Sequence, residues 1–254
     1  MVSSPLRTRE GNGSENSSGN SSVQDLLHAL RDSLPAELAE RLRTGAAPDE
    51  TSALPRLATG ITVLDALLGG GFPRGRVTEI TGPLSSGRTS LALALLAAAT
   101  RAGEIAAVVD AADAFDPASA AAAGIDLSRV LWARPPRPRE ALRCAERLLE
   151  ARGFGVVVLD FDVLVEARAT GERSSSIWMR MSRSATASGT ALVLVASSMR
   201  AGPFAALSLE ARATRVHFAT RPDWLEGLDA RVVPIRNRLG GSEESVGLQW
   251  KIAR

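Results

Sequence analysis

The stretch GPLSSGRTS, residues 82–90, lies between a short apolar run and a long one rich in alanine and leucine. Two glycines five positions apart, followed by a basic residue and a hydroxyl residue, have the spacing of a phosphate-binding loop (P-loop). The basic residue is Arg88, where such loops carry a lysine. A planar guanidinium replaces a compact ammonium poorly between two phosphates, so Arg88 argues against efficient ATP hydrolysis.

The scarcity of lysine offers a second explanation for Arg88. Lys251 is the only lysine among 30 basic residues, so codon bias alone would favour arginine at any basic position. Drift at a catalytic lysine would nevertheless be purged if ATP turnover mattered. Under either explanation, Arg88 predicts a weakened nucleotide site.

Composition limits the class of protein. A chain of 254 residues with 45% hydrophobic residues is long enough for one full domain and some appended segments. It has no uninterrupted apolar run of membrane-spanning length and no secretion signal at its start, so we expect a cytoplasmic protein. The single cysteine, Cys144, excludes an internal disulfide and a multi-cysteine metal cage. A net charge of +2 permits an anionic partner without requiring one.

Changes in composition along the chain predict four segments. Residues 1–22 are rich in Ser, Asn and Gly and predict a disordered tail. Residues 23–45 carry leucines at helical spacing around Pro35 and predict an amphipathic helical segment, which packs either on its own core or on a partner. Residues 46–56 read as a linker, and residues 57–254 as the core domain.

Within residues 57–254, apolar strands alternate with helices. Strands are expected at RVTEIT, IAAVVD, RVLWA, VVVLD and ALVLVASS, with helices between them. This alternation predicts an α/β fold with a mostly parallel sheet covered by helices on both faces. After Arg212 the pattern changes to ATRVHFAT, RVVPIRN and ESVGLQWKI, which predicts an antiparallel C-terminal extension with a hairpin around Gly240 and Gly241.

The predicted strand, loop and helix give the loop the context that nucleotide binding requires. Thr89 can ligate magnesium, and Asp160, at the end of VVVLD, has the position of a second magnesium-holding carboxylate. The candidate nucleotide-binding residues are Gly82, Ser85, Ser86, Gly87, Arg88, Thr89, Ser90 and Asp160, and Thr89 and Asp160 are the metal candidates if a magnesium nucleotide binds.

The segment from ATGITVLD to VLWARP, residues 58–135, resembles the RecA recombinase core in the order, spacing and identity of its residues. The resemblance includes Asp-Pro after the second strand and Gly-Ile-Asp before the third. The resemblance implies a RecA-type P-loop ATPase core. That family binds ATP between neighbouring subunits of a filament on single-stranded DNA.

Several working positions of that family are changed. Its general-base glutamate falls on Ala112, its adenine-stacking tyrosine on Ser119, and its γ-phosphate-sensing Asn-Gln on Ser197 and Ser198. Asp113 is adjacent to the lost base, but its side chain should leave the strand in another direction. Alanine cannot activate water, so these departures predict a degenerate ATPase that binds ATP and magnesium weakly at most.

Both loops by which the resemblance implies DNA contact are shortened here, near residues 166–175 and 199–206. The basic residues that flank them are the DNA candidates: Arg168, Arg173, Arg180, Arg183 and Arg200. A separate arginine-rich stretch over residues 129–152 is better explained as a solvated helix face than as a phosphate track. Four tryptophans offer base stacking or, more commonly, core or partner contacts.

The triplet Arg236, Asn237 and Arg238 has the basic-Asn-basic pattern by which, in the resembled family, one subunit reaches its neighbour's nucleotide. These residues are the subunit-interface candidates. Charged side chains that guard an exposed hairpin edge explain the triplet equally well.

Among RecA-like groups, the chain most resembles the ImuA family, accessory proteins of SOS-induced translesion synthesis that work with ImuB. The resemblance implies a non-catalytic cytoplasmic adaptor that needs no cofactor and binds ImuB, with RecA, single-stranded DNA and self-association as further partner hypotheses. A DNA-dependent ATPase or recombinase mediator with an atypical P-loop is the first alternative. A damage-induced cell-division inhibitor is the second.

Overall fold

The computed structural model describes residue 32 and residues 54–161, 175–219, 225–240 and 244–251. The chain divides into two units, Met1–Glu50 and Thr51–Arg254, and the elements described below belong to the second. Apart from residue 32, the predicted tail and helical segment lie outside the described residues, as does most of the linker. Those three assignments therefore stay predictions.

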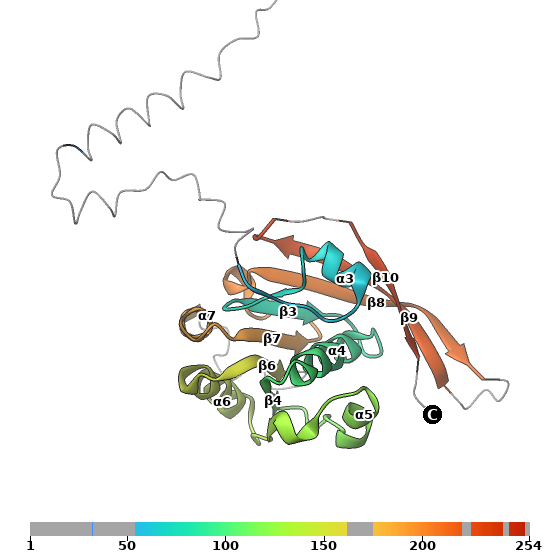
Figure 1. Ribbon diagram of the computed structural model, residues 1–254, viewed down its shortest axis with the longest axis horizontal. Helices are drawn as coiled ribbons and strands as arrows, with labels where there is room; N and C mark the ends of the chain where they lie inside the picture. Colours follow the sequence, from blue (N-terminus) through green and yellow to red (C-terminus); the bar gives the residue numbers. More distant parts are fainter. Residues whose placement is uncertain (1–31, 33–53, 162–174, 220–224, 241–243, 252–254) are drawn as a thin grey trace, which may run out of the picture. The chain divides into compact units, whose positions relative to one another are not determined.

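Eight strands of the described residues form one mixed sheet (Figure 1). Among β3 to β8, each pair of neighbouring strands is parallel. Strand β9 pairs antiparallel with β8 on one side and with β10 on the other. From one edge to the other, the order is β10 (Val246–Lys251), β9 (Leu225–Asn237), β8 (Leu207–Phe218), β3 (Val77–Thr81), β7 (Ala191–Ala196), β6 (Phe154–Asp160), β4 (Ile105–Asp110) and β5 (Val130–Ala133). The predicted α/β class with an antiparallel C-terminal extension is confirmed.

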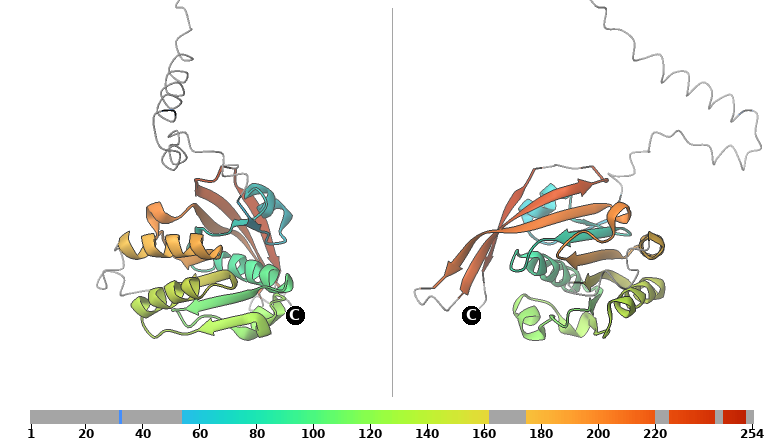
Figure 2. Two further views of the ribbon diagram at one scale, coloured as in Figure 1. Left: turned by 60° about the vertical axis from the view of Figure 1, so that its left-hand side comes forward. Right: turned by 180° about the vertical axis from the view of Figure 1, so that it is seen from behind.

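Helices cover both faces of the sheet, which explains why its strands are continuously apolar. In β4, for example, Ala106 and Val108 pack on one face and Ala107 and Val109 on the other. The first face packs against α4 (Arg88–Arg101), α3 (Thr62–Leu67) and α5 (Pro117–Ala122), and the second against α6 (Pro138–Ala151) and α7 (Ser175–Ser188) (Figure 2). The described helices are too short or too polar to span a membrane.

Two features differ from the sequence prediction. A small antiparallel pair, β1 (Arg56–Leu57) and β2 (Phe72–Pro73), stands before β3 and was not predicted. The last part of the sheet also begins earlier than Arg212, because β8 starts at Leu207 and its first residues pair in parallel with β3. Beyond Ala211 most β8 side chains are exposed, and the β8–β9–β10 ribbon extends past the helices (Figure 1).

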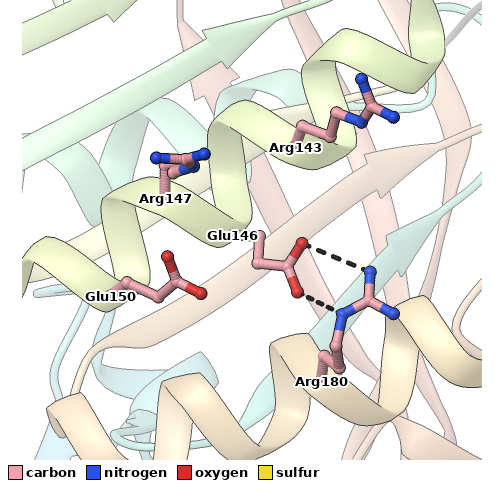
Figure 3. A pocket seen from close by; sticks show the side chains of 5 residues that line it. All are labelled: Arg143, Glu146, Arg147, Glu150 and Arg180. Atoms are coloured by element: carbon pink, nitrogen blue, oxygen red, sulfur yellow. Dashed lines mark hydrogen bonds and ion pairs between the residues drawn. The ribbon is translucent and has the colours of Figure 1, made fainter.

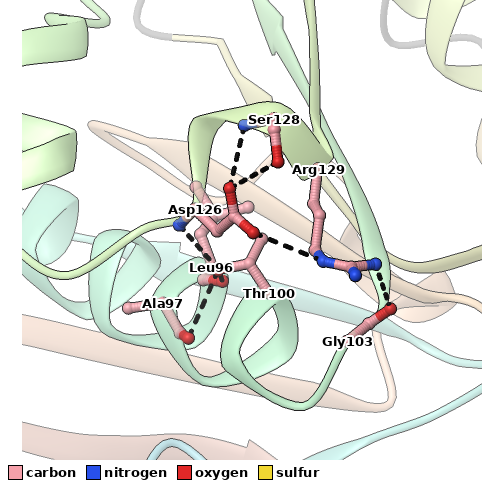
Figure 4. A network of polar contacts seen from close by, with 7 residues as sticks. All are labelled: Leu96, Ala97, Thr100, Gly103, Asp126, Ser128 and Arg129. Atoms are coloured by element: carbon pink, nitrogen blue, oxygen red, sulfur yellow. Dashed lines mark hydrogen bonds and ion pairs between the residues drawn. The ribbon is translucent and has the colours of Figure 1, made fainter.

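The Gly-Ile-Asp segment before β5 is held by a polar network at the end of α4 (Figure 4). Asp126 accepts a hydrogen bond from the Ser128 amide and caps the 3₁₀ turn η1 (Leu127–Arg129). Hydrogen bonds from Ser128 are the main reason that the pKa of Asp126 lies below its usual range. The Asp126 amide donates to Thr100 Oγ1, and Arg129 Nη1 donates to the Gly103 carbonyl. These contacts fix the start of β5 against α4.

Candidate functional site

The P-loop, residues 82–89, connects the end of β3 to the start of α4, as the sequence predicts. Ser85 and Gly87 have positive φ angles of 58° and 90°, and no side chain caps the first turn of α4. Such a turn directs backbone N–H groups and the positive end of a helix dipole toward an anion. The backbone of the loop therefore fits a phosphate group.

Neighbouring strands pack tightly against the loop. A Cβ on Gly82 would lie 2.3 Å from the Ala211 carbonyl oxygen of β8, so only glycine fits there. Ser86 is fully buried, and its Oγ has no hydrogen-bond partner among the described residues. Thr89 is exposed, and Ser90 is half-buried. The Ser86 hydroxyl lies beneath the loop beside Gly82 rather than at its outer surface.

The side chain of Arg88 is turned into the loop. It is 5% exposed, and Nη1 donates a hydrogen bond to the carbonyl oxygen of Gly82, at the opposite end of the turn. The basic side chain of a working P-loop reaches the β- and γ-phosphates, whereas this guanidinium is bonded within the loop. Arg88 thus joins the two ends of its own loop.

A second side chain, Trp250 of β10, lies against the loop from the sheet. A Cβ added to Gly87 would be 2.9 Å from Trp250 Nε1 and 3.3 Å from the Ala230 Cβ of β9. The indole Nε1 is buried and has no hydrogen-bond partner in the described parts of the chain. The antiparallel extension therefore packs directly on the glycine that precedes α4.

Carboxylates gather where the parallel strands end, because carboxyl ends of parallel strands share one edge of the sheet. Asp160 ends β6 and is the register partner of Asp110, which ends β4. Asp110 is 1% exposed and accepts hydrogen bonds from the amides of Ala114 and Phe115 and from Trp132 Nε1. Asp110 holds the turn after β4, and Asp160 is half-buried.

The position expected for a general base carries Ala112, and the adjacent Asp113 is engaged elsewhere. Arg134 Nε and Nη2 donate to the two carboxylate oxygens of Asp113 at 2.7 and 2.8 Å. The guanidinium carbon of Arg134 also lies 5.0 Å from the centre of the Trp132 ring. Asp113 is therefore the acceptor of a two-pronged ion pair. No group of His, Cys, Asp and Glu in the described residues is arranged to hold a metal.

The loop after β7, residues 197–206, is tied to the body of the domain. Glu79, in the middle of β3, is fully buried and accepts hydrogen bonds from the amides of Arg200 and Ala201 at 2.6 and 2.7 Å. Ser197 and Ser198 are exposed at the start of the loop. A buried carboxylate requires such donors, so Glu79 and the loop stabilise each other.

The predicted interface triplet fastens the same loop from β9. Arg236 Nη1 donates to the Gly202 carbonyl, and Arg238 Nη1 donates to the Pro203 carbonyl at 2.8 Å. Asn237 Nδ2 donates to the Gly240 carbonyl at 2.7 Å. Each member thus has a contact within the chain, and a role at a subunit interface stays a prediction.

Of the five predicted DNA-contacting arginines, the structure describes Arg180, Arg183 and Arg200, and their role stays a prediction. Arg168 and Arg173 lie outside the described residues. Arg180, on α7, forms an ion pair with Glu146 of α6 with a shortest distance of 2.5 Å, and Arg183 is exposed on α7. Arg200 is half-buried in the fastened loop.

The Arg180–Glu146 pair lies in a pocket between α6 and α7 with a volume of about 450 Å³ (Figure 3). Its remaining lining residues, Arg143, Arg147 and Glu150, mix both signs of charge. The hydrogen bond and charge of Glu146 raise the pKa of Arg180 further above its usual value. With three arginines against two glutamates, the pocket carries a net charge of only +1, which gives little electrostatic attraction for a polyanion.

Sequence reasoning missed three side chains of this site. Glu79 had a readable signal, because a charged residue inside an otherwise apolar strand is seldom buried without partners. Arg134 and Trp250 had none, because their roles depend on which strands become neighbours.

The family model for the RecA N-terminal domain matches residues 43–201. This chain belongs to the RecA N-terminal domain family. RecA of Chlorobaculum parvum is 44% identical over 124 residues, which are 48% of this chain and 36% of that protein. RecA of Crocosphaera subtropica is 44% identical over 113 residues, 44% of this chain and 32% of that protein. The matched segments thus span about a third of these curated relatives.

A crystal structure of the RadB recombinase has the same fold. It superposes with a TM-score of 0.57 at 21% identity and covers 75% of this chain and 94% of the RadB chain. At that identity the likeness concerns the fold. Membership of the RecA N-terminal domain family rests on the family model.

Proposed function

We propose that this RecA-family protein is a non-catalytic adaptor in the response to DNA damage. The observation that carries the proposal is the arrangement of Arg88, whose guanidinium is buried and bonded to the carbonyl of Gly82. A loop closed by its own basic side chain does not depend on a bound phosphate for its shape. We infer that the loop is retained for the fold and that ATP and magnesium bind weakly at most.

The surroundings of the loop support the absence of turnover. Hydrolysis needs a base within hydrogen-bond reach of the attacking water. Ala112 supplies none, and the Asp113 carboxylate is held by Arg134. Both oxygens of that carboxylate already accept hydrogen bonds from Arg134, so Asp113 would have to leave the ion pair before it could orient an attacking water.

The resemblance to the ImuA family supplies the pathway. On that basis we propose a role in SOS-induced translesion synthesis, with an ImuB-like polymerase-family protein as the main partner and RecA as a further one. A loop after β7 that is fastened by Glu79, Arg236 and Arg238 suits a constant protein-binding surface better than a switching DNA loop. Cytoplasmic location belongs to the same proposal.

A second candidate, a DNA-dependent ATPase or recombinase mediator, is favoured by a different observation. The backbone of the P-loop keeps the positive φ angles at Ser85 and Gly87, and Thr89 and Asp160 are present at the magnesium positions. In that case single-stranded DNA would stimulate ATP hydrolysis.

ATP turnover separates the two candidates. The purified protein is assayed with and without single-stranded DNA, beside Asp160→Ala as the matched control for any contaminating ATPase. The adaptor predicts equal, background rates for both proteins, and a fluorescent ATP analogue should bind weaker than micromolar. Hydrolysis above background that Asp160→Ala abolishes would establish the ATPase instead.

Partner binding tests the adaptor directly. Tagged full-length protein should retain an ImuB-like protein in a pull-down, and it should do so equally with and without ATP. Failure to retain ImuB from a culture in which DNA damage has induced it would remove the translesion-synthesis role.

DNA binding needs its own measurement. A phosphate-contacting role predicts that affinity for single-stranded DNA falls steeply as salt rises. Arg183→Ala, which removes an exposed charge on α7, should then weaken binding and reduce the salt slope by about one. Salt-independent or undetectable binding would exclude DNA as a partner of the isolated protein.

A further inference from the structure

The two edges of the sheet differ in how well they are protected against pairing with another chain. At one edge, β5 has four residues and runs toward Pro135 and Pro136. At the other, β10 has six residues, contains no proline and pairs with β9 without a bulge. No strand of the described residues pairs with the outer side of β10. An exposed, regular edge of this kind is a template for strand addition.

The side chains of β10 separate cleanly between its two faces. Val246, Leu248 and Trp250 belong to or pack against the core, so they share the inner face. The residues that alternate with them are exposed, namely Ser245, directly before the strand, and Gly247, Gln249 and Lys251. Lys251 is the one charged residue of β10 and stands at its last position. The middle of the strand therefore carries no charge that would repel an identical strand.

We propose that β10 is a self-association edge, on which a second copy of this chain pairs antiparallel about a two-fold axis at Leu248. Antiparallel pairing centred there sets Trp250 opposite Val246 of the second copy, and Leu248 opposite its own counterpart. On the outer face, Lys251 lies opposite Ser245 of the second copy, so no like charges meet. Cross-strand apolar pairs of this kind stabilise a sheet, and the sheets of the two copies become continuous.

The strand pattern selects both this register and a second copy as the occupant. A shift of one residue sets Trp250 opposite the outer-face Ser245, because a single-residue slip exchanges the two faces of a strand. A shift of two residues keeps the faces aligned but leaves either Val246 or Trp250 without a partner in β10. The centred register alone pairs all three inner-face residues with one another. The edge is therefore complementary to itself.

The assembly is a closed dimer and not an open filament. Pairing a strand with its own copy about a two-fold axis uses the same surface on both subunits, so nothing remains to add a third. The contact is small, which predicts an association that depends on protein concentration.

Sedimentation velocity of the full chain over a concentration series, at low salt, tests the proposal through the outer-face pair of Lys251 and Ser245. Each such pair occurs twice in the dimer. Ser245→Glu places opposite charges across the strands and should strengthen dimerisation by about tenfold, whereas Ser245→Lys places like charges there and should weaken it by about tenfold. The double variant Ser245→Lys/Lys251→Glu restores opposite charges and should recover the dimer.

Matched controls separate the register from net charge. Ala187 is exposed on α7, away from the β10 edge. Ala187→Glu and Ala187→Lys make the same changes in net charge as the two Ser245 variants and should leave dimerisation unchanged. Circular dichroism of each variant checks that these exposed substitutions leave the fold intact.

Three results would overturn this assignment. One is a wild-type protein that stays monomeric throughout the series, which would leave the edge to an extended segment of a different protein. Another is a double variant as weak as Ser245→Lys, which would place a dimer contact elsewhere. The third is an equal loss in Ala187→Lys, which would reduce the effect to net charge.

Discussion

Gly87→Ala tests whether Trp250 packs on the P-loop as closely as described. The new methyl group would be placed 2.9 Å from Trp250 Nε1 and 3.3 Å from the Ala230 Cβ. Cβ contacts below 3.0 Å essentially do not occur, so the indole or the loop must move. Gly103→Ala is a matched control, because Gly103 has a similar φ of +83° and a Cβ there would meet nothing within 4 Å.

The magnitude follows from separating two costs. Both substitutions force alanine into a left-handed backbone conformation, which costs about 1–2 kcal/mol. Gly87→Ala adds overpacking, which typically costs about 1–3 kcal/mol more. The free energy of unfolding should therefore fall by about 1–2 kcal/mol in Gly103→Ala and by about 2–5 kcal/mol in Gly87→Ala.

Urea unfolding followed by circular dichroism measures both values, since two-state analysis gives the free energy from the midpoint and slope. A double-mutant cycle with Trp250→Ala then isolates the contact. In the Trp250→Ala background, most of the extra cost at Gly87 should disappear. Equal destabilisation in Gly87→Ala and Gly103→Ala, or no coupling to Trp250, would refute the packing of β10 on the loop.

Three further predictions follow from buried or paired polar groups. Glu79→Ala leaves two backbone N–H groups of the loop after β7 without acceptors and should lower the free energy of unfolding by about 2–4 kcal/mol, with faster amide exchange at Ala201; unchanged exchange would contradict the fastening. Arg88→Met removes the donor to the P-loop carbonyl and should lower the thermal midpoint, whereas an unchanged midpoint would mean that the contact adds nothing. The contact with His217, whose Nε2 lies 2.8 Å from Asp229 Oδ2, is the main reason that the pKa of Asp229 lies below its usual range. A carboxyl group of depressed pKa adds stability above its unfolded pKa and loses it as the pH falls through the folded value, so wild-type protein should lose more stability than Asp229→Asn between about pH 5 and pH 2, measured by thermal unfolding.

The parts of the fold that the sequence predicts are those that depend on local pattern. The continuous apolar strands, the intervening helices and the loop at residues 82–89 are each readable from a short window. The position of Asp160 at the carboxyl ends of the parallel strands can also be predicted, because the strand-loop-helix order fixes which strand ends lie together. The sequence pattern places the start of β8 too late. The first residues of this strand form a short stretch whose strand conformation depends on parallel pairing with β3, which the local sequence does not reveal.

The candidate site is less predictable from the sequence, because the hydrogen bonds and packing contacts of its long side chains depend on the conformations that these side chains adopt in the fold. The sequence indicates that Arg88 is a poor substitute for lysine, but not that its guanidinium is bonded to Gly82. It places Asp113 beside the lost base, but the ion pair with Arg134 requires β4 and β5 to be neighbours. The contact between Trp250 and Gly87 joins segments far apart in the chain, and no local pattern encodes it.

The fastening of the loop after β7 has a thermodynamic consequence for any partner that docks there. Flexible loops lose conformational entropy when they are ordered in a complex, and that loss subtracts from the affinity. This loop is already ordered by folding, because Glu79 accepts hydrogen bonds from two of its amides and Arg236 and Arg238 donate to two of its carbonyls. Little further entropy is therefore lost on binding. Glu79 also stands on the strand that leads into the P-loop. A partner would therefore meet a preorganised surface, which the buried Glu79 joins to the strand that leads into the P-loop.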